Sequence, residues 1–436
     1  MSDAQFHAYY KQTRPDRIKI LEQTNRISAD QAQMLLNGTG LSDDIADNMI
    51  ENALSTYKLP YGLALNFTIN GREIEVPMVT EEPSVIAAAS NGAKMISAGG
   101  GFTAQVDSRL MTGQIAFTKV ATQEMADQFS TWIRSNEDNL LAIANAAYPS
   151  IVKRGGGARS ISSQYFPASA NNQAFFNIYL TIDTQEAMGA NMMNTMLEAL
   201  KYHILTQVDF IENLEALMAI LSNYSLEATA TASCQIPATL FAKNDLDGPT
   251  VAERIAQASQ LAQVDVYRAT THNKGIMNGV DAFVLATGND WRAIEAGVHA
   301  YASRDGQYRG LATWTYDAAT EMLSGHLTLP MPLGAVGGSI GIHPTVQITK
   351  AILGQADAKT LMQIAVSVGL AQNLAAIRAL VSEGIQAGHM HLQARSLAIQ
   401  AGALESEIQI VVDALEKAPH MNLQTAKEIV AQLHED

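Results

Sequence analysis

Residues 271–290 read THNKGIMNGVDAFVLATGND and carry more chemistry than any other part of the chain. The stretch places Lys274, amide side chains and Asp290 around a glycine-rich turn and an apolar run at 282–286, which we expect to be a strand. A lysine that shares a dry pocket with carboxylates can polarise a carbonyl group, whereas a solvated surface lysine does so poorly. The stretch therefore predicts the electrophilic centre of an enzyme, provided that partner acids come from elsewhere in the chain.

The composition indicates a globular protein with two or three domains. The chain has 436 residues, of which 47% are hydrophobic, so each domain can bury its own core. The net charge is −15, from 28 basic and 43 acidic residues. That balance argues against nucleic acid as a partner, and it leaves room for a local basic pocket that binds a phosphorylated cofactor.

Three features predict a soluble cytoplasmic protein. The single cysteine, Cys234, excludes an internal disulfide framework and fits a reducing compartment. The first residues, MSDAQF, lack the basic-then-apolar order of a signal peptide. No run approaches the roughly 18 apolar residues that a membrane span requires.

The N-terminal third changes period along its length. Residues 1–58 predict polar amphipathic helices, and 66–76 alternate apolar and polar residues around Asn70-Gly71, which predicts a β-hairpin. A helix is expected to begin at Pro83 and to end in the glycines of 97–102.

The rest of the chain predicts a small α+β module inserted into a mostly helical domain. The module's expected elements are strands at 115–120, 160–165 and 175–182 and helices at 123–147 and 186–205. After residue 251 helices dominate, interrupted by the strand at 282–286 and the glycine-rich stretch 329–338. A long helix at 358–382, a further helix to about 402 and a charged tail follow.

Acids stand at the start of the helix that follows Pro83. Glu81 and Glu82 in its first turn are favoured by the helix dipole whatever the function, and such acids are common at helix starts. The functional alternative is a carboxylic acid beside Lys274 that donates or shares a proton.

Residues 186–191, EAMGAN, open a helix directly after an apolar strand. Small residues there let a ligand approach the backbone, whose free N–H groups attract phosphate. The alternative is a tightly packed helix start. Because the module has no GxGxxG sequence, any nicotinamide cofactor must be held outside a Rossmann site.

His389 follows Gly388 and lies five residues after Gly384, which indicates a hinge that carries the histidine into and out of a site. A packed or solvated histidine is the alternative. The other histidines lack metal-ligand spacing, so we expect no metal site, and we interpret Cys234 as structural.

Six motifs, in this order, resemble the class II (bacterial, soluble) 3-hydroxy-3-methylglutaryl-CoA (HMG-CoA) reductases over nearly the whole chain. They are LPYGLALNFTING, VPMVTEEPSVIAAAS, EAMGANMMNTMLE, YRATTHNKGIMNGVDAFVLATGNDWRAIEAGVHAYA, MPLGAVGG and EGIQAGHM. Class I enzymes carry their catalytic lysine soon after a Ser-x-Asn-Tyr-like segment. The corresponding residues 222–228 here hold no lysine, and Lys274 takes the role, as in class II.

The resemblance implies an α+β fold with a large, mostly helical substrate-binding domain. It places that domain at 1–110 and 218–382, an inserted small non-Rossmann cofactor domain at 111–217, and a mobile helical flap at 383–436. It further implies that HMG-CoA is reduced to mevalonate in two hydride transfers, with release of coenzyme A. The implied catalytic residues are Glu82, Lys274, Asp290 and His389, and the implied substrate-binding residues are Ser84, Arg268, Thr271 and Asn278.

The chemistry accounts for these residue types. Lys274 can stabilise the oxyanion that develops at each reduction, while Asp290 keeps the lysine charged and Glu82 shares the proton that is consumed. The coenzyme A thiolate, with a pKa of about 8.5, can take a proton from an imidazolium with a pKa of about 6.5, a role that suits His389 on its flap.

The cofactor is expected to be NADPH in preference to NADH. NADH-selective relatives carry an acid where Tyr148 aligns, and an acid there would repel a 2′-phosphate; here Lys153 and Arg154 lie close by instead. Many relatives have Asp where Glu186 stands, and the flap reads GHMHLQAR in place of GHMxLHAR. The expected cofactor-binding residues are Tyr148, Lys153, Arg154, Glu186, Met188, Gly189 and Asn191.

The family builds its active site between two subunits, so the resemblance implies a homodimer, alone or within a hexamer built as a trimer of dimers. Two other functions stay open at this point. One is a non-redox acyl-CoA lyase or hydrolase that uses Glu82 and His389, and the other is a catalytically silent scaffold that binds coenzyme A.

Overall fold

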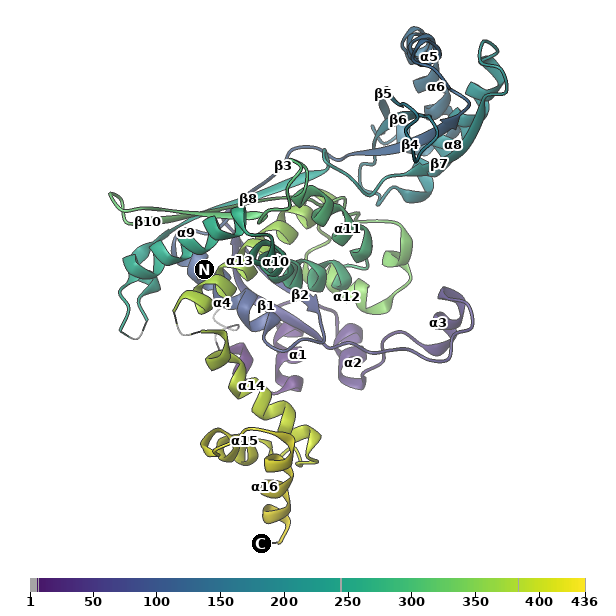
Figure 1. The fold of residues 1–436 in the computed structure, drawn as a ribbon. Helices are drawn as coiled ribbons and strands as arrows, with labels where there is room; N and C mark the ends of the chain where they lie inside the picture. The colour runs from purple at the N-terminus through teal and green to yellow at the C-terminus, as the bar shows by residue number, and fades with distance from the viewer. Residues whose placement is uncertain (1–5, 7, 244, 383, 436) are drawn as a thin grey trace.

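The protein has three parts: a mixed α+β core, a small α+β unit at one end and a group of C-terminal helices at the other (Figure 1). The computed structural model describes residues 6, 8–243, 245–382 and 384–435, with the side chains of 385–392 and 435 left out. Each part has its own cluster of buried hydrophobic side chains. This arrangement confirms the predicted α+β class.

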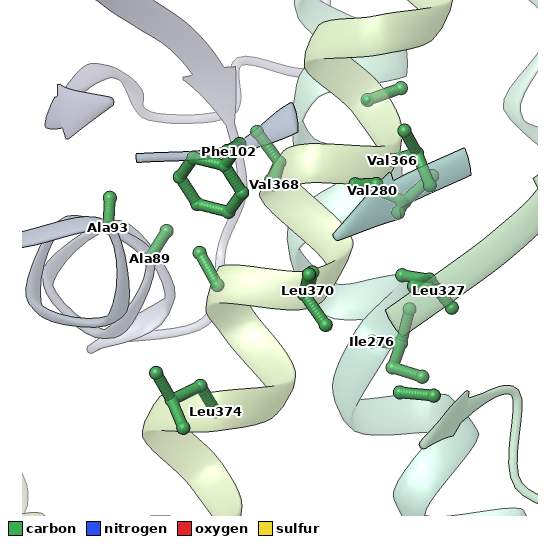
Figure 2. Packing of buried hydrophobic residues seen from close by; sticks show 14 of the residues in the cluster. Ala89, Ala93, Phe102, Ile276, Val280, Leu327, Val366, Val368, Leu370 and Leu374 are labelled. Carbon is green, nitrogen blue, oxygen red and sulfur yellow. The ribbon is translucent and has the colours of Figure 1, made fainter. Parts of the chain in front are cut away.

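The core is built around helix α13 (Ala358–Val381), which packs against α4 (Val85–Ala98) and α10 (Val266–Ala286). Figure 2 shows side chains of these helices in one cluster: Ala89, Ala93, Ile276, Val280, Val368, Leu370 and Leu374. The helices approach closely because glycines stand at the crossings. A Cβ on Gly92 would lie 2.1 Å from the Ala371 carbonyl oxygen, so no larger residue fits there.

The predicted hairpin is present. Strands β1 (Tyr61–Ile69) and β2 (Arg72–Val79) pair antiparallel. Asn70 and Gly71 at the turn both have positive φ angles, 49° and 76°, as a tight two-residue hairpin turn requires. Helix α4 follows and ends at Gly99, as predicted.

A second sheet of the core was not predicted. Its order is β3-β8-β10-β9, and every neighbouring pair is antiparallel; the strands are β3 (Thr103–Val106), β8 (Thr229–Pro237), β9 (Ala312–Asp317) and β10 (Met322–Pro330). None of its four strands was predicted from the sequence, and the predicted strand at 282–286 is wrong, because these residues form the last turns of α10. A short buried apolar run has no clear period, so it fits a strand and a buried helix equally well.

Further helices complete the core. They are η3 (Ala238–Phe241), α9 (Gly248–Val264), α11 (Trp291–Ala302), η4 (Gly338–Gly341) and α12 (Pro344–Ile352). Within the described part of the chain, α13 alone is long and apolar enough to cross a membrane, and 72% of its most apolar window is buried inside the protein. It has the burial expected of a core helix.

The small unit is an antiparallel sheet with helices packed against it. The sheet order is β5-β6-β4-β7, and the strands are β4 (Leu110–Thr118), β5 (Gly157–Phe166), β6 (Phe175–Asp183) and β7 (Glu215–Leu221). Its helices are α5 (Gln123–Ser135), α6 (Glu137–Ala147), α7 (Pro149–Val152) and α8 (Ala190–Gln207). The domain boundary expected at 217 lies inside β7, so the sheet itself extends to Leu221.

The single helix predicted at 123–147 is two helices. Asn136 leaves the helical conformation (φ −113°, ψ 11°), and its side-chain amide donates to the Trp132 carbonyl, which closes the end of α5. The chain then turns directly into α6.

The N-terminal residues form η2 (Tyr9–Lys11), α1 (Arg14–Gln23), α2 (Ala29–Asn37) and α3 (Asp43–Met49). Hydroxyl side chains of Thr13, Ser28 and Ser42 cap the three α-helices. Helices α1 and α2 pack against α12 through a separate apolar cluster.

The C-terminal helices are α14 (Ile385–Gln400), α15 (Ile408–Lys417) and α16 (Leu423–Glu435). The tail predicted after about residue 402 is therefore largely helical. These helices bury their apolar faces against one another, and Gly384, with φ 81°, connects them to the core at the end of α13.

Candidate active site

Lys274 and Glu82 meet although they lie far apart in the sequence. The Lys274 Nζ donates to Glu82 Oε2 at 2.9 Å. Lys274 projects from the middle of α10, and Glu82 lies in the turn between β2 and α4. The carboxylate and lysine of the sequence hypothesis are thus in direct contact.

The pair is open to solvent in this structure. The side chains of Lys274 and Glu82 are 60% and 40% exposed, so the dry pocket expected from the sequence is absent from this single described chain. An exposed ion pair contributes about 0–1 kcal/mol to stability. The pair is therefore not explained as a device that holds the fold together.

The substrate-binding residues expected on α10 share one face of the helix with Lys274. Their spacing of three or four residues aligns them, and they are Arg268, Thr271 and Asn278. Burial lowers the pKa of the Arg268 guanidinium, and the nearby Asp265 carboxylate opposes that shift. Half-buried and still strongly basic, Arg268 suits a carboxylate ligand.

Ser84 stands at the start of α4 in a left-handed conformation, with φ 71°. Its hydroxyl donates to the carbonyl of Pro83, so no side chain caps the helix at this position. Ser84 follows Glu82 by two residues, and its strained backbone conformation belongs to the same turn.

Asp290 lies apart from the lysine. Its Oδ1 accepts from the Ala293 N–H at 3.0 Å and so caps α11, and Arg292 Nε lies 3.8 Å from the same oxygen. Asp290 and Lys274 are both described, and no ion pair joins them. The expected direct contact between them is absent here.

His389 falls in α14, and its side chain lies outside the described residues, as does that of His391. The structure therefore places the helix that carries His389 but says nothing about the imidazole.

The EAMGAN segment forms a loop that leads into α8. Gly189, with φ 94°, precedes the helix and offers no side-chain cap, so the first N–H groups of α8 stay available to an anion, and Asn191 is exposed in the first turn. Met188 lies beside the glycine-rich loop, because a Cβ on Gly338 would come within 2.3 Å of its methyl carbon. Glu186 is exposed and instead contacts the start of α13, where its Oε2 accepts from the Ala358 N–H at 2.8 Å.

The loop at 153–157, which carries Lys153 and Arg154, packs close to the segment that leads into EAMGAN. Lys153 and Arg154 are exposed just after α7, and Tyr148, between α6 and α7, is half-buried against the small unit's core. A Cβ on Gly156 would lie 2.6 Å from the Asp183 carbonyl oxygen, which shows how closely this loop packs against the end of β6. Uncapped N–H groups and adjacent positive charges fit the phosphates of a dinucleotide.

A cavity of about 930 Å³ links several of these segments. Its lining includes Asp290 and Trp291 at the start of α11, Met188 from the loop before α8, and Tyr57 and Lys58 from the extended N-terminal segment. The volume lies within the range of small-molecule sites, and the cavity brings Asp290 and Met188 to one space.

Two buried polar residues in this region were missed by the sequence analysis. Arg109 and Asn289 are each 7% exposed and bond mainly to backbone groups of neighbouring loops. A polar residue whose partners are backbone atoms leaves no pattern in the sequence, so only the fold reveals it.

Comparison with known proteins agrees with this geometry. Residues 13–394 match the hydroxymethylglutaryl-coenzyme A reductase family. The 3-hydroxy-3-methylglutaryl-coenzyme A reductase of Archaeoglobus fulgidus is 39% identical over 428 residues, which cover 98% of this chain and 94% of that protein.

Solved structures extend the match to three dimensions. The 3-hydroxy-3-methylglutaryl-coenzyme A reductase of Streptococcus pneumoniae is 48% identical, with a TM-score of 0.82 over 98% of this chain and 99% of that one. A structure of the class II enzyme from the same organism, bound to NADPH in open conformations, has a TM-score of 0.80 at 48% identity and covers 97% and 100% of the two chains. By sequence and by structure, this chain belongs to the hydroxymethylglutaryl-coenzyme A reductase family, in its class II branch.

Proposed function

We propose that this protein reduces the thioester of HMG-CoA to mevalonate, with release of coenzyme A and oxidation of two NADPH. The observation that carries the proposal is the contact between Lys274 and Glu82 on the face of α10 that also presents Arg268, Thr271 and Asn278. When bound, NADPH supplies the hydride for each reduction.

Lys274 stabilises the negative charge that develops on the carbonyl oxygen at each reduction. An ammonium group is suited to this because it carries a compact charge and three donors. Glu82, at 2.9 Å, holds the ammonium in place and takes part in delivering the proton that the alkoxide needs. Arg268 binds the free carboxylate of the HMG group, and Ser84 contributes a hydroxyl at the same site.

Catalysis requires water to be excluded from the pair, since an exposed lysine is screened by solvent. We assign that closure to the C-terminal helices, which have their own core and connect to α13 through Gly384. Closure brings His389 to the thiolate of coenzyme A, to which it donates a proton. Asp290 keeps the lysine charged in the closed site.

Substrate binding is assigned to 1–110 and 218–382, cofactor binding to 111–217 and the flap to 383–436. In the cofactor part, the N–H groups at the start of α8 hold the pyrophosphate, together with Met188, Gly189 and Asn191. Lys153 and Arg154 bind the 2′-phosphate beside Tyr148, where NADH would leave these charges without a partner. Comparison of kcat/KM for the two cofactors tests this preference, and a higher value for NADH would contradict it.

A homodimer, alone or as a trimer of dimers, is supported by apolar side chains that a monomer leaves in water. Leu54 and Tyr57 in the extended N-terminal segment are 99% and 91% exposed, and Val264 and Tyr267 beside the start of α10 are also exposed. Light scattering on the purified protein measures the mass directly, and a monomer at micromolar concentration would contradict the assembly. The one cysteine, buried and unpaired, supports a cytoplasmic location.

One assay tests the reaction. Protein, HMG-CoA and NADPH are mixed, and nicotinamide absorbance and free thiol are followed together. Two NADPH oxidised for each thiol released supports the proposal. Thiol release without oxidation would indicate a lyase or hydrolase, and neither signal would indicate a protein that only binds.

A further inference from the structure

We propose that Asn289 and Arg109 are positioning residues, which fix the cofactor loop 184–189 at a set distance from the segment that carries Asp290. Both act on one short connection, the glycine-rich stretch 333–338. The inference rests on the proposed function, which places the cofactor at 186–191 and catalysis at Asp290.

Asn289 holds the connection from the Asp290 side. Its Oδ1 accepts from the Gly334 N–H at 2.8 Å, and its Nδ2 donates to the Gly334 carbonyl at 3.0 Å. Two bonds to both polar groups of one residue fix position and orientation together. Nδ2 also donates to the Thr287 hydroxyl at 3.0 Å, which fixes the amide's own orientation. Asp290 follows directly in the chain.

Arg109 holds the connection from the cofactor side. It directly precedes β4 and is buried at the boundary between the small unit and the core. Its guanidinium donates to the carbonyls of Gln185 and Ala187, the second at 3.2 Å, and to the Leu333 carbonyl at 2.7 Å. Met188 and Gly189 of the cofactor loop follow these carbonyls directly.

A planar group with several donors is needed to span this boundary. Further Arg109 bonds reach the Thr184 hydroxyl at 3.5 Å and the Met362 sulfur of α13 at 3.1 Å. Burial lowers the pKa of Arg109, while the carboxylates of Glu186, Asp183 and Asp357 oppose that shift and so favour the charge. A lysine has one nitrogen and cannot reach the same set of acceptors.

Backbone hydrogen bonds also join the loop held by Arg109 to the stretch held by Asn289. The Glu186 carbonyl accepts from the Ala335 and Val336 N–H groups at 2.8 Å and 3.2 Å. A Cβ on Gly334 would lie 2.5 Å from the Met188 nitrogen, so the two loops are in direct contact.

Hydride transfer is sensitive to such placement. A shift of about 1 Å between reacting groups can cost about 100-fold in rate. Arg109 and Asn289 touch neither reacting atom, and they act by keeping the cofactor loop and Asp290 in register across the boundary between the two parts of the molecule.

The test uses full-length Arg109→Met and Asn289→Asp, with Asn70→Asp as the matched control. Asn70 makes the same pair of bonds to one residue, Ala104, at 2.8 Å and 2.9 Å, but at the hairpin turn outside the described site. NADPH affinity is measured by fluorescence titration without substrate, HMG-CoA affinity by calorimetry, and turnover in steady state.

We expect Arg109→Met to weaken NADPH binding about tenfold and both variants to lower kcat about 10- to 100-fold, while HMG-CoA affinity changes less than about twofold. Asn70→Asp should leave all three near wild type. Because both residues bind the peptide group that joins Leu333 to Gly334, the double variant should lose less than the product of the single losses.

Three results would overturn the inference: kinetics and NADPH affinity unchanged in both variants while only the melting temperature falls, an equal loss of HMG-CoA affinity, or multiplicative effects in the double variant. Failure of the proposed function is distinguishable, because the wild-type protein itself would then fail to oxidise NADPH in the presence of HMG-CoA.

Discussion

One face of helix α10 carries accessible polar residues, and the other carries buried polar residues. The outer face presents groups that a ligand can reach, Arg268, Thr271, Lys274 and Asn278. The inner face buries His272 and Asn273, which bond to neighbouring elements through His272 Nε2 and both polar atoms of Asn273. Chemistry and stability are thus separated by half a turn of one helix, and substitutions on the two faces should affect different measurements.

On the inner face, both polar side-chain atoms of Asn273 have partners. Asn273 Nδ2 donates to the Arg309 carbonyl at 2.8 Å, and its Oδ1 accepts from the Leu311 N–H at 2.9 Å. The Asn373 Oδ1 accepts from the Trp314 indole N–H at 2.8 Å, which orients the amide. The Asn373 Nδ2 therefore donates to His272 Nε2 at 3.2 Å. These bonds join α10 to α13 and to the strand β9.

The largest effect is expected on the outer face. Lys274→Ala should lower kcat about a thousandfold or more, because the developing oxyanion loses its charged donor. Circular dichroism and the melting temperature should stay close to wild type, as the lysine is exposed. Lys94→Ala, an exposed lysine on α4, is the control and should keep full activity. A Lys274→Ala protein that is active, or unfolded, would contradict the separation of the two faces.

The next effect is expected on the inner face. Asn273→Ala removes the partners of the Arg309 carbonyl and the Leu311 N–H, which leaves two buried polar groups unsatisfied and should cost about 2–4 kcal/mol of unfolding free energy. Urea denaturation measures the loss. Thr270→Ala on the exposed side of the same helix should change stability by less than about 0.5 kcal/mol. Equal losses from the two variants would erase the contrast.

The inner face should also make stability depend on pH. Burial lowers the pKa of His272 from 6.5 to about 4, and the positive charge of Arg268 adds to the shift. Below pH 6.5 His272 is protonated in the unfolded chain but stays neutral in the folded protein. Stability should therefore fall as the pH drops toward about 4. Between pH 6.5 and about 5 the loss amounts to about 2 kcal/mol.

The variant His272→Gln, which does not titrate, should flatten this dependence. Urea denaturation at a series of pH values measures the slope for both proteins. Identical slopes would mean that another group causes the acid sensitivity.

The smallest effect concerns the ion pair itself. A double-mutant cycle of Lys274→Met and Glu82→Gln should give a coupling below about 1 kcal/mol in unfolding free energy, because both groups are exposed. The same variants assayed for turnover should show losses far larger than that coupling. A coupling of several kcal/mol would mean that the pair is structural after all.

Local signals in the sequence predicted part of the fold. The Asn70-Gly71 turn and the glycine stop of α4 depend on a few neighbouring residues, so the sequence was enough to identify them. Residues 282–286 were assigned wrongly because a short apolar run suits either kind of element, and only packing against α13 decides for a helix.

The site was predictable only where motifs were available. Glu82 and Lys274 are 192 residues apart in the sequence, and their pairing was inferred from family resemblance. Spacing alone cannot pair such distant residues. Glu186 shows the limit of that route, because its carboxylate binds the start of α13. Arg109 and Asn289 could not be found, as both bond mainly to backbone atoms that every sequence contains.

The contact of Gly92 with Ala371 has a consequence for synthesis of the chain. The strands and helices of the small unit lie between residues 110 and 221, so all of it leaves the ribosome while the core still lacks α13. Helix α4 cannot complete its packing until α13 has been synthesised, so the core has a higher contact order than the small unit. We expect the small unit to fold first, and limited proteolysis of chains stalled near residue 270 should find it protected while α4 is still cleaved.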